Sequence, residues 1–542
     1  MLKNKMLPAA IIAGLSAMSA AGPARAVHVN PEGLGQVLFY PYYTVQDNFV
    51  TALSIINTTS LTKAVKVRFL EGKNSREVLD FNLFLAPTDV WTGVVLPTDT
   101  GARLETGDNS CVTPSDLFGN AAGQVRTDGN GLPLNSFKTY QFTGANVDFG
   151  FSGFDSPSRT REGYIEVFEM GIVTDATLQG FIRHARSGAT TGQPANCAAL
   201  DGYDGLSSVA MPAVKFPGNY LTSPGGGLTG RASIINAANG TNYTYDVTAL
   251  DGWWAPLVPG PGNVPYSAAG AITPSISIQA GISTVSYVLS GNPTVPNSIG
   301  VLRAVWASPR EAVSAVLMHD SIINEFLNDA GTVSKTDWVI TMPTKRDHIG
   351  VGAGIPSRPF SNNFSNTSTA GACETYRLRM FNRELGTLSS SPGTINIGLP
   401  PPVATPIPIA LCYGVNVIEL GATGLLRSHN NFRLLNGFDM FGSITATTTG
   451  AAFATLRRRT LQGPNGWLSI GFGAFGDAAQ TQQSITPLSA TLNGVAVNGT
   501  HFGLPVIGAM FHNYTNTGVA SAYGGVVPHK YTRNADVFRA VP

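Results

Sequence analysis

The sequence predicts a mainly β protein made of two or more antiparallel β-sandwich units with a few helical insertions. Glycine and proline are abundant, with 61 and 35 residues among 542, which indicates many turns. Segments of strand character recur at roughly ten- to fifteen-residue intervals in the first part of the chain. Only one stretch carries a full set of helix-start signals. Together these observations favour short strands in sandwiches over long helices.

The first strands are expected between residues 36 and 96. Residues 36–45 (QVLFYPYYTV) are aromatic and β-branched, and residues 50–57 (VTALSIIN) follow them. Residues 64–70 (AVKVRFL) alternate apolar and basic side chains. Residues 77–85 and 89–96 continue the pattern, and polar turns separate the segments. This spacing is typical of an antiparallel sandwich.

A short motif of the second strand occurs again later. Ser54–Asn57 (SIIN) recurs as Ser233–Asn236, and a polar turn follows each copy. We interpret each asparagine as the residue that ends the strand, because its side chain can bond to nearby backbone. Duplication of a sandwich unit and chance both remain open as origins of the repeat.

The expected domain boundary lies at residues 222–227 (TSPGGG), since three glycines after a proline disfavour both strand and helix. We therefore divide the chain into three parts. Residues 1–26 are a signal peptide, residues 27–222 an N-terminal β-sandwich domain, and residues 228–542 a C-terminal β-rich region.

One helix is predicted near residues 308–327 of that C-terminal region. Ser308 as N-cap, Pro309 at the first helical position and Glu311 three residues after the cap match a capping box. The apolar residues that follow at helical spacing are Val313, Val316, Leu317, Ile323, Phe326 and Leu327. Such a stripe is expected to be buried against a β-layer. A shorter helix is expected within residues 174–186.

The N-terminus has the pattern of a secretory signal peptide. Lys3 and Lys5 precede a short apolar stretch, and Ala24-Arg25-Ala26 supplies small residues for cleavage after Ala26. An uncleaved anchor is the alternative. No later stretch reaches 18 consecutive apolar residues, so no transmembrane helix is expected in the mature chain. The predicted location is extracytoplasmic, either secreted or at the outer cell surface.

The four cysteines are expected to form disulfides, as is usual for an even number in an exported chain. Three connectivities are possible. The local one, Cys111 with Cys197 and Cys373 with Cys412, keeps each bridge within one half of the chain. Zinc is disfavoured because no cysteine pair has CxxC spacing and no histidine lies within four residues of a cysteine.

The charge content bears on possible partners. Charged residues make up 12% of the chain and the net charge is +1, so no basic surface for nucleic acid is expected. Low surface charge allows copies of the chain to pack together. Lys345-Arg346 and the triplet Arg457–Arg459 could contact cell-surface polysaccharide, or they could simply be solvated.

No catalytic or cofactor-binding residue is predicted from motifs. The chain has no HExxH and no GxSxG. Calcium remains an alternative to a simple turn at Asp128–Gly131 and at Asp201–Gly205. We considered two further sets, namely the carboxylates Glu162, Glu166 and Glu169 as hydrolytic residues and the tryptophans Trp91, Trp253 and Trp254 as sugar-stacking residues. The preferred interpretation is an exposed polar strand face for the first set and core residues for the second.

Two segments resemble uncharacterised exported or surface proteins of Gram-negative bacteria. They are Asn48–Gly93 and Thr336–Arg346 (TDWVITMPTKR), and the first also has the rhythm of immunoglobulin-like domains. The resemblance implies export and an immunoglobulin-like β-sandwich fold. It implies no functional residue.

The leading hypothesis is a non-catalytic secreted or cell-surface structural or adhesion protein, part of a surface assembly. It follows from the signal peptide, the low charge, the β-rich pattern and the missing catalytic motifs. The alternative is an exported carbohydrate-active or ester-cleaving hydrolase whose site is assembled from residues far apart in sequence. Whether the chain is an enzyme is therefore open, with the sequence favouring a non-catalytic protein.

Overall fold

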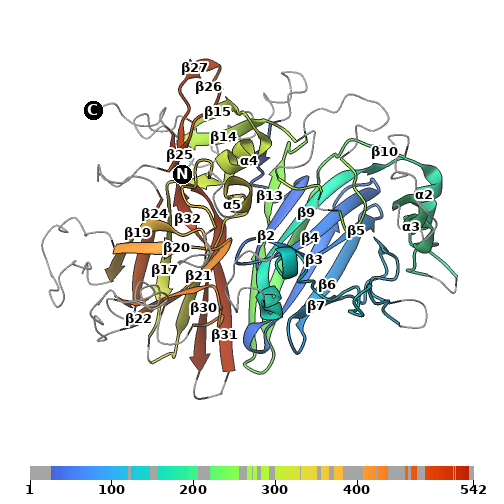
Figure 1. Cartoon of the computed structure of the whole chain (residues 1–542), viewed down its shortest axis with the longest axis horizontal. Helices are drawn as coiled ribbons and strands as arrows, with labels where there is room; N and C mark the ends of the chain where they lie inside the picture. Colours follow the sequence, from blue (N-terminus) through green and yellow to red (C-terminus); the bar gives the residue numbers. More distant parts are fainter. Residues whose placement is uncertain are drawn as a thin grey trace, which may run out of the picture.

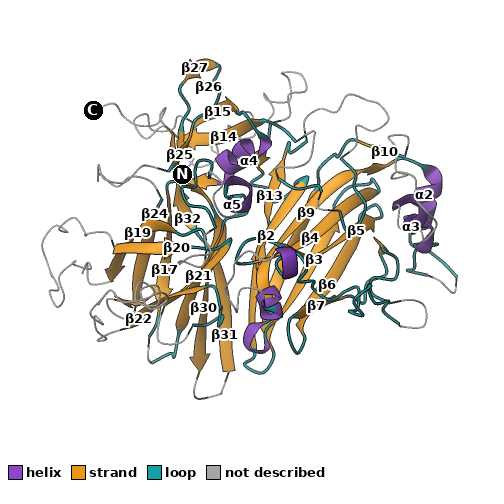
Figure 2. Cartoon of the chain, in the orientation of Figure 1, coloured by secondary structure: helices purple, strands orange, loops and turns teal. Residues whose placement is uncertain are grey.

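The computed structural model describes residues 26–119, 124–146, 156–188, 191–204, 220–254, 265–271, 273–276, 282–291, 299–329, 331–350, 356–364, 371–382, 407–420, 424–436, 458–461, 465–472, 483–516, 518 and 521–535. The predicted signal peptide lies outside the described residues except for Ala26. As predicted, the chain is mainly β, with several antiparallel sheets arranged as sandwiches and a few short helices (Figures 1 and 2).

The first sandwich consists of two sheets, on the right of Figure 1. The larger sheet has the order β1-β13-β2-β9-β4-β5-β8, with β10 beside β9, and the smaller has the order β12-β11-β3-β6-β7. The bounds are β1 His28–Val29, β2 Val37–Thr44, β3 Val50–Asn57, β4 Lys63–Glu71, β5 Glu77–Leu85, β6 Val90–Pro97, β7 Ala102–Glu105, β8 Cys111–Thr113, β9 Glu162–Val173, β10 Leu221–Thr222, β11 Leu228–Asn236, β12 Thr241–Asp246 and β13 Thr248–Asp251.

The larger sheet is covered on both faces. β2 and β4 are buried along their whole length, whereas β3 and β11 of the smaller sheet alternate between buried and more exposed residues. Leu38 of β2 packs into the sandwich core, while its neighbours Val37 and Phe39 pack on the other face with Trp253 and Trp254. Burial on both faces explains why the β2 sequence is almost continuously apolar.

The two SIIN motifs lie on neighbouring strands. β3 and β11 pair antiparallel, with Asn57 opposite Leu228. The side chain of Asn57 donates hydrogen bonds to the carbonyl oxygens of Leu61 and Ala86 at 2.7 and 2.8 Å. The side chain of Asn236 donates to the carbonyl oxygen of Asp47 at 3.0 Å. The predicted strand-ending role of both asparagines is confirmed.

The boundary predicted between residues 222 and 228 does not separate two sheets, because residues 228–251 return to both sheets of the first sandwich. The glycines lie in an irregular loop that connects β10 to β11 within this sandwich. Gly226 and Gly227 have φ values of 79° and 81°, which favour glycine. The glycine run is therefore a loop of the first sandwich and not a linker between domains.

The second sandwich, on the left of Figure 1, also has two sheets. One has the order β23-β22-β21-β18-β30-β31 and the other β20-β19-β24-β17-β32. Their bounds are β17 Ser321–Leu327, β18 Lys335–Thr341, β19 Glu374–Asn382, β20 Ile407–Leu411, β21 Val415–Leu420, β22 Asn431–Asn436, β23 Arg458–Leu461, β24 Asn465–Gly471, β30 Ile507–Asn516, β31 Ser521–Pro528 and β32 Lys530–Thr532. Buried apolar residues of both sheets, such as Ile322 and Trp338, form its core.

Smaller sheets and helices complete the fold (Figure 2). The small sheets are β14-β15-β26-β27, β16-β29 and β25-β28-β33. Their bounds are β14 Val285–Gly291, β15 Ile299–Val305, β16 Met318–His319, β25 Ser484–Ile485, β26 Ser489–Leu492, β27 Val495–Val497, β28 His501–Phe502, β29 Leu504–Pro505 and β33 Asn534–Ala535. The helices are α2 Ala176–Ile182, α3 Ala198–Asp204, α4 Pro309–Leu317 and α5 Lys345–His348, and short 3₁₀ turns occur at Gln46–Asn48, Gly144–Asn146 and Pro157–Arg161. In the described part of the chain, no helix has the length and apolar character needed to cross a membrane.

The helix predicted near residues 308–327 is correct in its first half only. α4 begins as expected, with the Glu311 carboxylate accepting a hydrogen bond from the backbone N–H of Ser308 at 3.0 Å. It ends at Leu317, and residues 321–327 form strand β17. In β17, buried Ile322, Asn324 and Phe326 alternate with the more exposed Ile323 and Glu325. This is strand alternation, because pairing with β24 overrides the helical spacing. α2 lies within the second predicted helical segment.

Candidate functional site

Charged side chains line the outer face of the larger sheet of the first sandwich, on β9, β4 and β5, which are neighbours in this sheet. The register places Arg68 of β4 opposite Glu166 of β9 and Asp80 of β5. Lys66 lies two residues from Arg68 and therefore on the same face. We call Lys66, Arg68, Glu77, Asp80 and Glu166 the buried charge cluster.

Ion pairs connect the members of this cluster. Arg68 Nε lies 2.6 Å from Glu77 Oε2, and Arg68 Nη1 lies 2.9 Å from Glu166 Oε2. Lys66 Nζ lies 2.9 Å from Asp80 Oδ2. None of the five side chains is more than 8% exposed. Buried charges of this kind are tolerated only when they are paired, so the loss of one partner would leave an uncompensated charge in the interior.

A segment from the middle of the chain covers the cluster. Lys66 Nζ donates to the carbonyl oxygen of Ala268 at 2.6 Å, and Arg68 Nη1 donates to that of Pro274 at 3.2 Å. The backbone N–H of Gly270 donates to Asp80 Oδ2 at 2.7 Å. The charge cluster therefore also holds the covering segment in place, through hydrogen bonds to the backbone of that segment.

Arg68, Glu77 and Glu166 of the cluster line a cavity of about 130 Å³, and Ser275 and Asp347 also line it. Burial raises the pKa of Glu166 to about 7, although the nearby Arg68 opposes this shift. Asp347 and Glu77 raise the pKa further by like-charge repulsion. A carboxyl group with this pKa can give or take a proton near neutral pH, which is what general acid–base chemistry requires.

An activated nucleophile is not found in this cavity. The hydroxyl of Ser275 is buried and has no hydrogen-bond partner within the described ranges. Among the described residues that line the cavity there is no histidine. A serine hydroxyl attacks a substrate with the help of a base bound to it, and neither Glu166 nor another described residue is hydrogen-bonded to the Ser275 hydroxyl.

No protein-family model matches this chain, and no curated protein matches it either. The chemistry of the cluster therefore has to be inferred from its geometry. The sequence contains a pattern that could have indicated the charge cluster. Basic residues stand at positions 66 and 68 of one strand, and acidic or polar residues stand at positions 80 and 82 of the next strand. Opposite charges with this period on paired strands indicate cross-strand ion pairs.

The prediction that Glu162, Glu166 and Glu169 form an exposed polar face is wrong, because all three are at most 2% exposed. They are not brought together at one site. Glu166 belongs to the charge cluster, and Glu162 accepts hydrogen bonds from the hydroxyls of Tyr42 and Ser428 at 2.9 and 2.6 Å. β9 is buried on both faces, whereas its glutamates suggested an exposed face in the sequence. This difference explains the error.

Glu169 forms a separate buried site with Lys63, whose Nζ lies 2.6 Å from Glu169 Oε1. The Glu169 carboxylate also accepts hydrogen bonds from the backbone N–H groups of Gly225 and Gly226 at 3.0 and 2.7 Å. Both ionic side chains are fully buried. Lys63 of β4 and Glu169 of β9 both bind the backbone of the glycine loop, so this ion pair holds the loop on the two strands. The pair therefore has a structural role.

The tryptophans are core residues, as preferred from the sequence. Trp91 is fully buried in the first sandwich, and Trp253 and Trp254 are buried on the other face of the larger sheet. None of the three presents a ring for sugar stacking.

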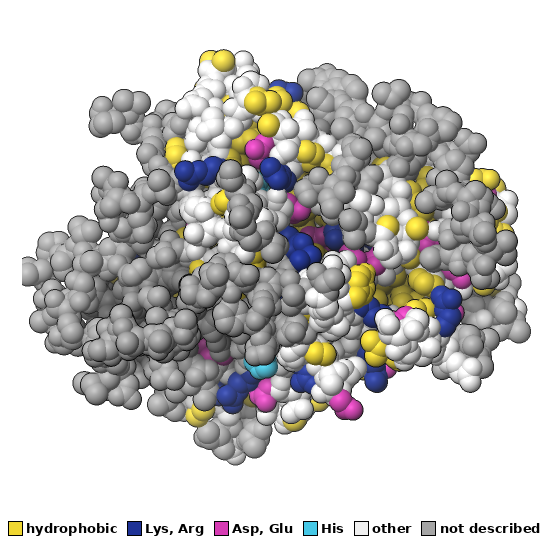
Figure 3. Space-filling model, viewed as in Figure 1, with side chains coloured by type: hydrophobic (Ala, Val, Ile, Leu, Met, Phe, Trp, Pro, Cys, Tyr) yellow, Lys and Arg dark blue, Asp and Glu magenta, His cyan; other side chains and the backbone are white. Residues whose placement is uncertain are grey.

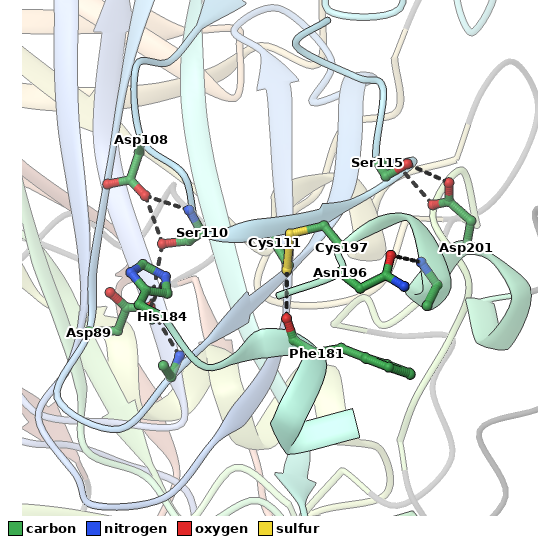
Figure 4. The surroundings of a disulfide bond; sticks show 12 residues. Asp89, Asp108, Ser110, Cys111, Ser115, Phe181, His184, Asn196, Cys197 and Asp201 are labelled. Atoms are coloured by element: carbon green, nitrogen blue, oxygen red, sulfur yellow. Dashed lines mark hydrogen bonds and ion pairs between the residues drawn. A yellow bond between two sulfur atoms is a disulfide. The ribbon is translucent and has the colours of Figure 1, made fainter. Parts of the chain in front are cut away.

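Both predicted disulfides, Cys111–Cys197 and Cys373–Cys412, are present. The first joins β8 to the start of α3 (Figure 4). The two bridges indicate an oxidising, extracytoplasmic environment.

A serine, a histidine and aspartates lie near the first disulfide (Figure 4). Ser110 Oγ donates to Asp108 Oδ1 at 2.7 Å and lies 3.4 Å from Asp89 Oδ2. His184 Nε2 is 3.6 Å from the same Asp89 oxygen and makes no hydrogen bond within the described residues. The hydroxyl is thus bonded to carboxylates and not to the imidazole, unlike the nucleophile of a catalytic triad.

The Asp128 and Asp201 carboxylates of the two candidate calcium turns are occupied by hydrogen bonds to other groups of the protein. Asp128 accepts hydrogen bonds from the backbone N–H groups of Asn130 and Leu132 and lies 3.0 Å from Lys138 Nζ. Asp201 accepts from the backbone N–H and hydroxyl of Ser115. Within the described ranges, no group of three or more His, Cys, Asp or Glu side chains is placed to hold a metal ion.

Lys345 does not belong to an exposed basic patch, because it is 2% exposed. Its Nζ donates to the carbonyl oxygens of Leu411 and Tyr413 at 3.2 and 3.4 Å, and burial lowers its pKa to about 7. The side chains of the triplet Arg457–Arg459 lie outside the described residues. A polysaccharide-binding role of Lys345 is therefore not supported.

Proposed function

We propose that this chain is a non-catalytic structural or adhesion protein of the cell surface. The observation that carries the proposal is that the buried carboxylates are separated, each with its own hydrogen-bond or ion-pair partners. Glu162, Glu166 and Glu169 each have their own partners, and those partners join strands or loops of the fold. Such an arrangement serves to hold segments together, whereas a hydrolytic site needs its carboxylates on either side of a substrate.

The distribution of charge also supports the proposal. Part of the small charged content is used in buried ion pairs, including Lys63–Glu169 and Arg159–Glu71. On the face shown in Figure 3, the described charged side chains are sparse, and acidic and basic groups lie next to each other near the middle. A surface with little net charge allows copies of the chain to pack without repulsion.

Cell fractionation tests this proposal. The expected result is that the chain sediments with the outer cell envelope and that a native extract contains it in large assemblies. A freely diffusing monomer in the periplasm would contradict the proposal.

A hydrolase is the second candidate, and the raised pKa of Glu166 in its cavity favours it. A screen with chromogenic glycosides and esters separates the two functions. Turnover that is lost in Glu166→Gln but retained in Glu105→Gln, at an exposed position, would establish the hydrolase. We expect no turnover by the unmodified protein.

A further inference from the structure

A second cavity, of about 170 Å³, lies where the two sandwiches meet α4. Strands β1 and β13 of the first sandwich, α4, and β17, β30 and β32 of the second sandwich region contribute to it. In Figure 1, α4 and β13 lie near the middle of the molecule, and β30 and β32 lie to their left. The walls are mostly apolar and include Val29, Val316, Leu317, Ile322, Val506 and Ile507.

His319 is a polar group in this apolar cavity. Its side chain stacks on the ring of Tyr531, with the ring centroids 4.1 Å apart. The residue is 8% exposed, and neither ring nitrogen has a partner with hydrogen-bond geometry among the described residues. A neutral imidazole always carries one N–H, so a donor at this position is left unused.

Arg533 is a further polar group in the lining of this cavity. Its Nη2 donates to the carbonyl oxygen of Val316 at 2.8 Å, and its guanidinium carbon lies 5.3 Å from the ring centre of Tyr531. Nη1 is buried and has no partner in the described part of the chain. Burial lowers the pKa of Arg533, and within the described ranges no carboxylate forms an ion pair with it. In the charge cluster, by contrast, Arg68 pairs with two glutamates.

We infer that this cavity binds a small monocarboxylate whose apolar body is an aromatic ring. A carboxylate accepts charge-assisted hydrogen bonds from a guanidinium, and the unused Nη1–H groups of Arg533 and the unused N–H of His319 are donors that line this cavity. The apolar walls would enclose the body of the ligand. An apolar cavity of about 150 Å³ accommodates benzene, so benzoate is of suitable size. Tyr531, which is 54% exposed, places the rim of the cavity in contact with solvent. The inference does not depend on the proposed structural role.

Isothermal titration calorimetry of the full-length protein with benzoate tests the inference. Benzyl alcohol and acetate are the comparison ligands. Benzoate should bind at least about tenfold more tightly than either, because the alcohol lacks the charge and acetate lacks the apolar body. Arg533→Gln should weaken benzoate binding by roughly ten- to a hundredfold, as expected for the loss of hydrogen bonds to a charged group. The control Arg427→Gln, at an exposed position, should leave the affinity unchanged.

The inference is overturned if benzoate does not bind, if benzyl alcohol or acetate binds equally well, or if Arg533→Gln binds like the unmodified protein. If Arg533→Gln does not fold, the comparison of the three ligands on the unmodified protein decides alone. Preference for benzoate supports the site, and equal binding or none refutes it.

Discussion

Phe511 of β30 packs edge-on against Tyr42 of β2, with the ring centroids 6.4 Å apart, and thereby joins the second sandwich to the first. The same phenylalanine meets Tyr243 and Tyr245 of β12 at 6.0 and 6.1 Å. The core of the first sandwich therefore continues into a sheet of the second. An aromatic contact of this kind adds stability beyond the apolar area that it buries.

Replacement of Phe511 by alanine should lower the free energy of unfolding by about 3 to 5 kcal/mol, because the residue is fully buried and the cavity cannot close. Denaturant titration followed by tryptophan fluorescence measures this loss. Tyr523→Ala is the control, since Tyr523 is 60% exposed and its loss should change stability by less than about 0.5 kcal/mol. If both variants changed the free energy of unfolding by the same small amount, the contact of Phe511 between the two sandwiches would not stabilise the fold.

Removal of the Cys111–Cys197 bridge by a double change to serine should cost about 4 to 5 kcal/mol, since it closes a separation of 86 residues. Removal of Cys373–Cys412, which spans 39, should cost slightly less, about 4 kcal/mol in the chain-entropy model. Unfolding under non-reducing conditions gives both values, and peptide mapping without reduction should recover both links. Free thiols in the exported protein would contradict the predicted pairing.

Leu317→Ala should cost about 2 to 5 kcal/mol, because Leu317 is 1% exposed at the end of α4. The matched control is Leu488→Ala, at a residue that is 72% exposed, for which less than about 0.5 kcal/mol is expected. The midpoint of chemical unfolding reports both. An unchanged midpoint for Leu317→Ala would mean that α4 does not pack as described.

The sequence was sufficient to predict the mainly β class, the pairing of the cysteines and the start of α4, because local patterns determine these features. The sequence was insufficient to predict features that depend on contacts between segments far apart in the chain. Ile323 and Phe326 fit a helical spacing, yet pairing with β24 places both in a strand. Glu166 lies at a cavity that is also lined by Ser275 and Ile276, more than a hundred residues away in the sequence. No periodicity within β9 encodes that arrangement.

The raised pKa of Glu166 predicts a pH dependence of stability. Because the folded state holds this proton up to about pH 7 while the unfolded state releases it near pH 4.5, stability should fall as the pH rises through this window. The contribution is about 3 kcal/mol for one fully buried group. Glu166→Gln removes it, so its stability should fall less between pH 5 and pH 7 than that of the unmodified protein.

Urea titrations across this pH range measure the difference. Glu105→Gln is the control, because Glu105 is 47% exposed and should leave the pH dependence as it is. Parallel pH profiles of Glu166→Gln and the unmodified protein would show that Glu166 titrates normally.

Protease treatment of intact cells that export the chain tests the proposed surface role most directly. The account predicts that an added protease removes the chain from intact cells while a periplasmic marker protein remains uncut. Protection of the chain until the outer envelope is opened, with the marker and the chain then cut together, would contradict it.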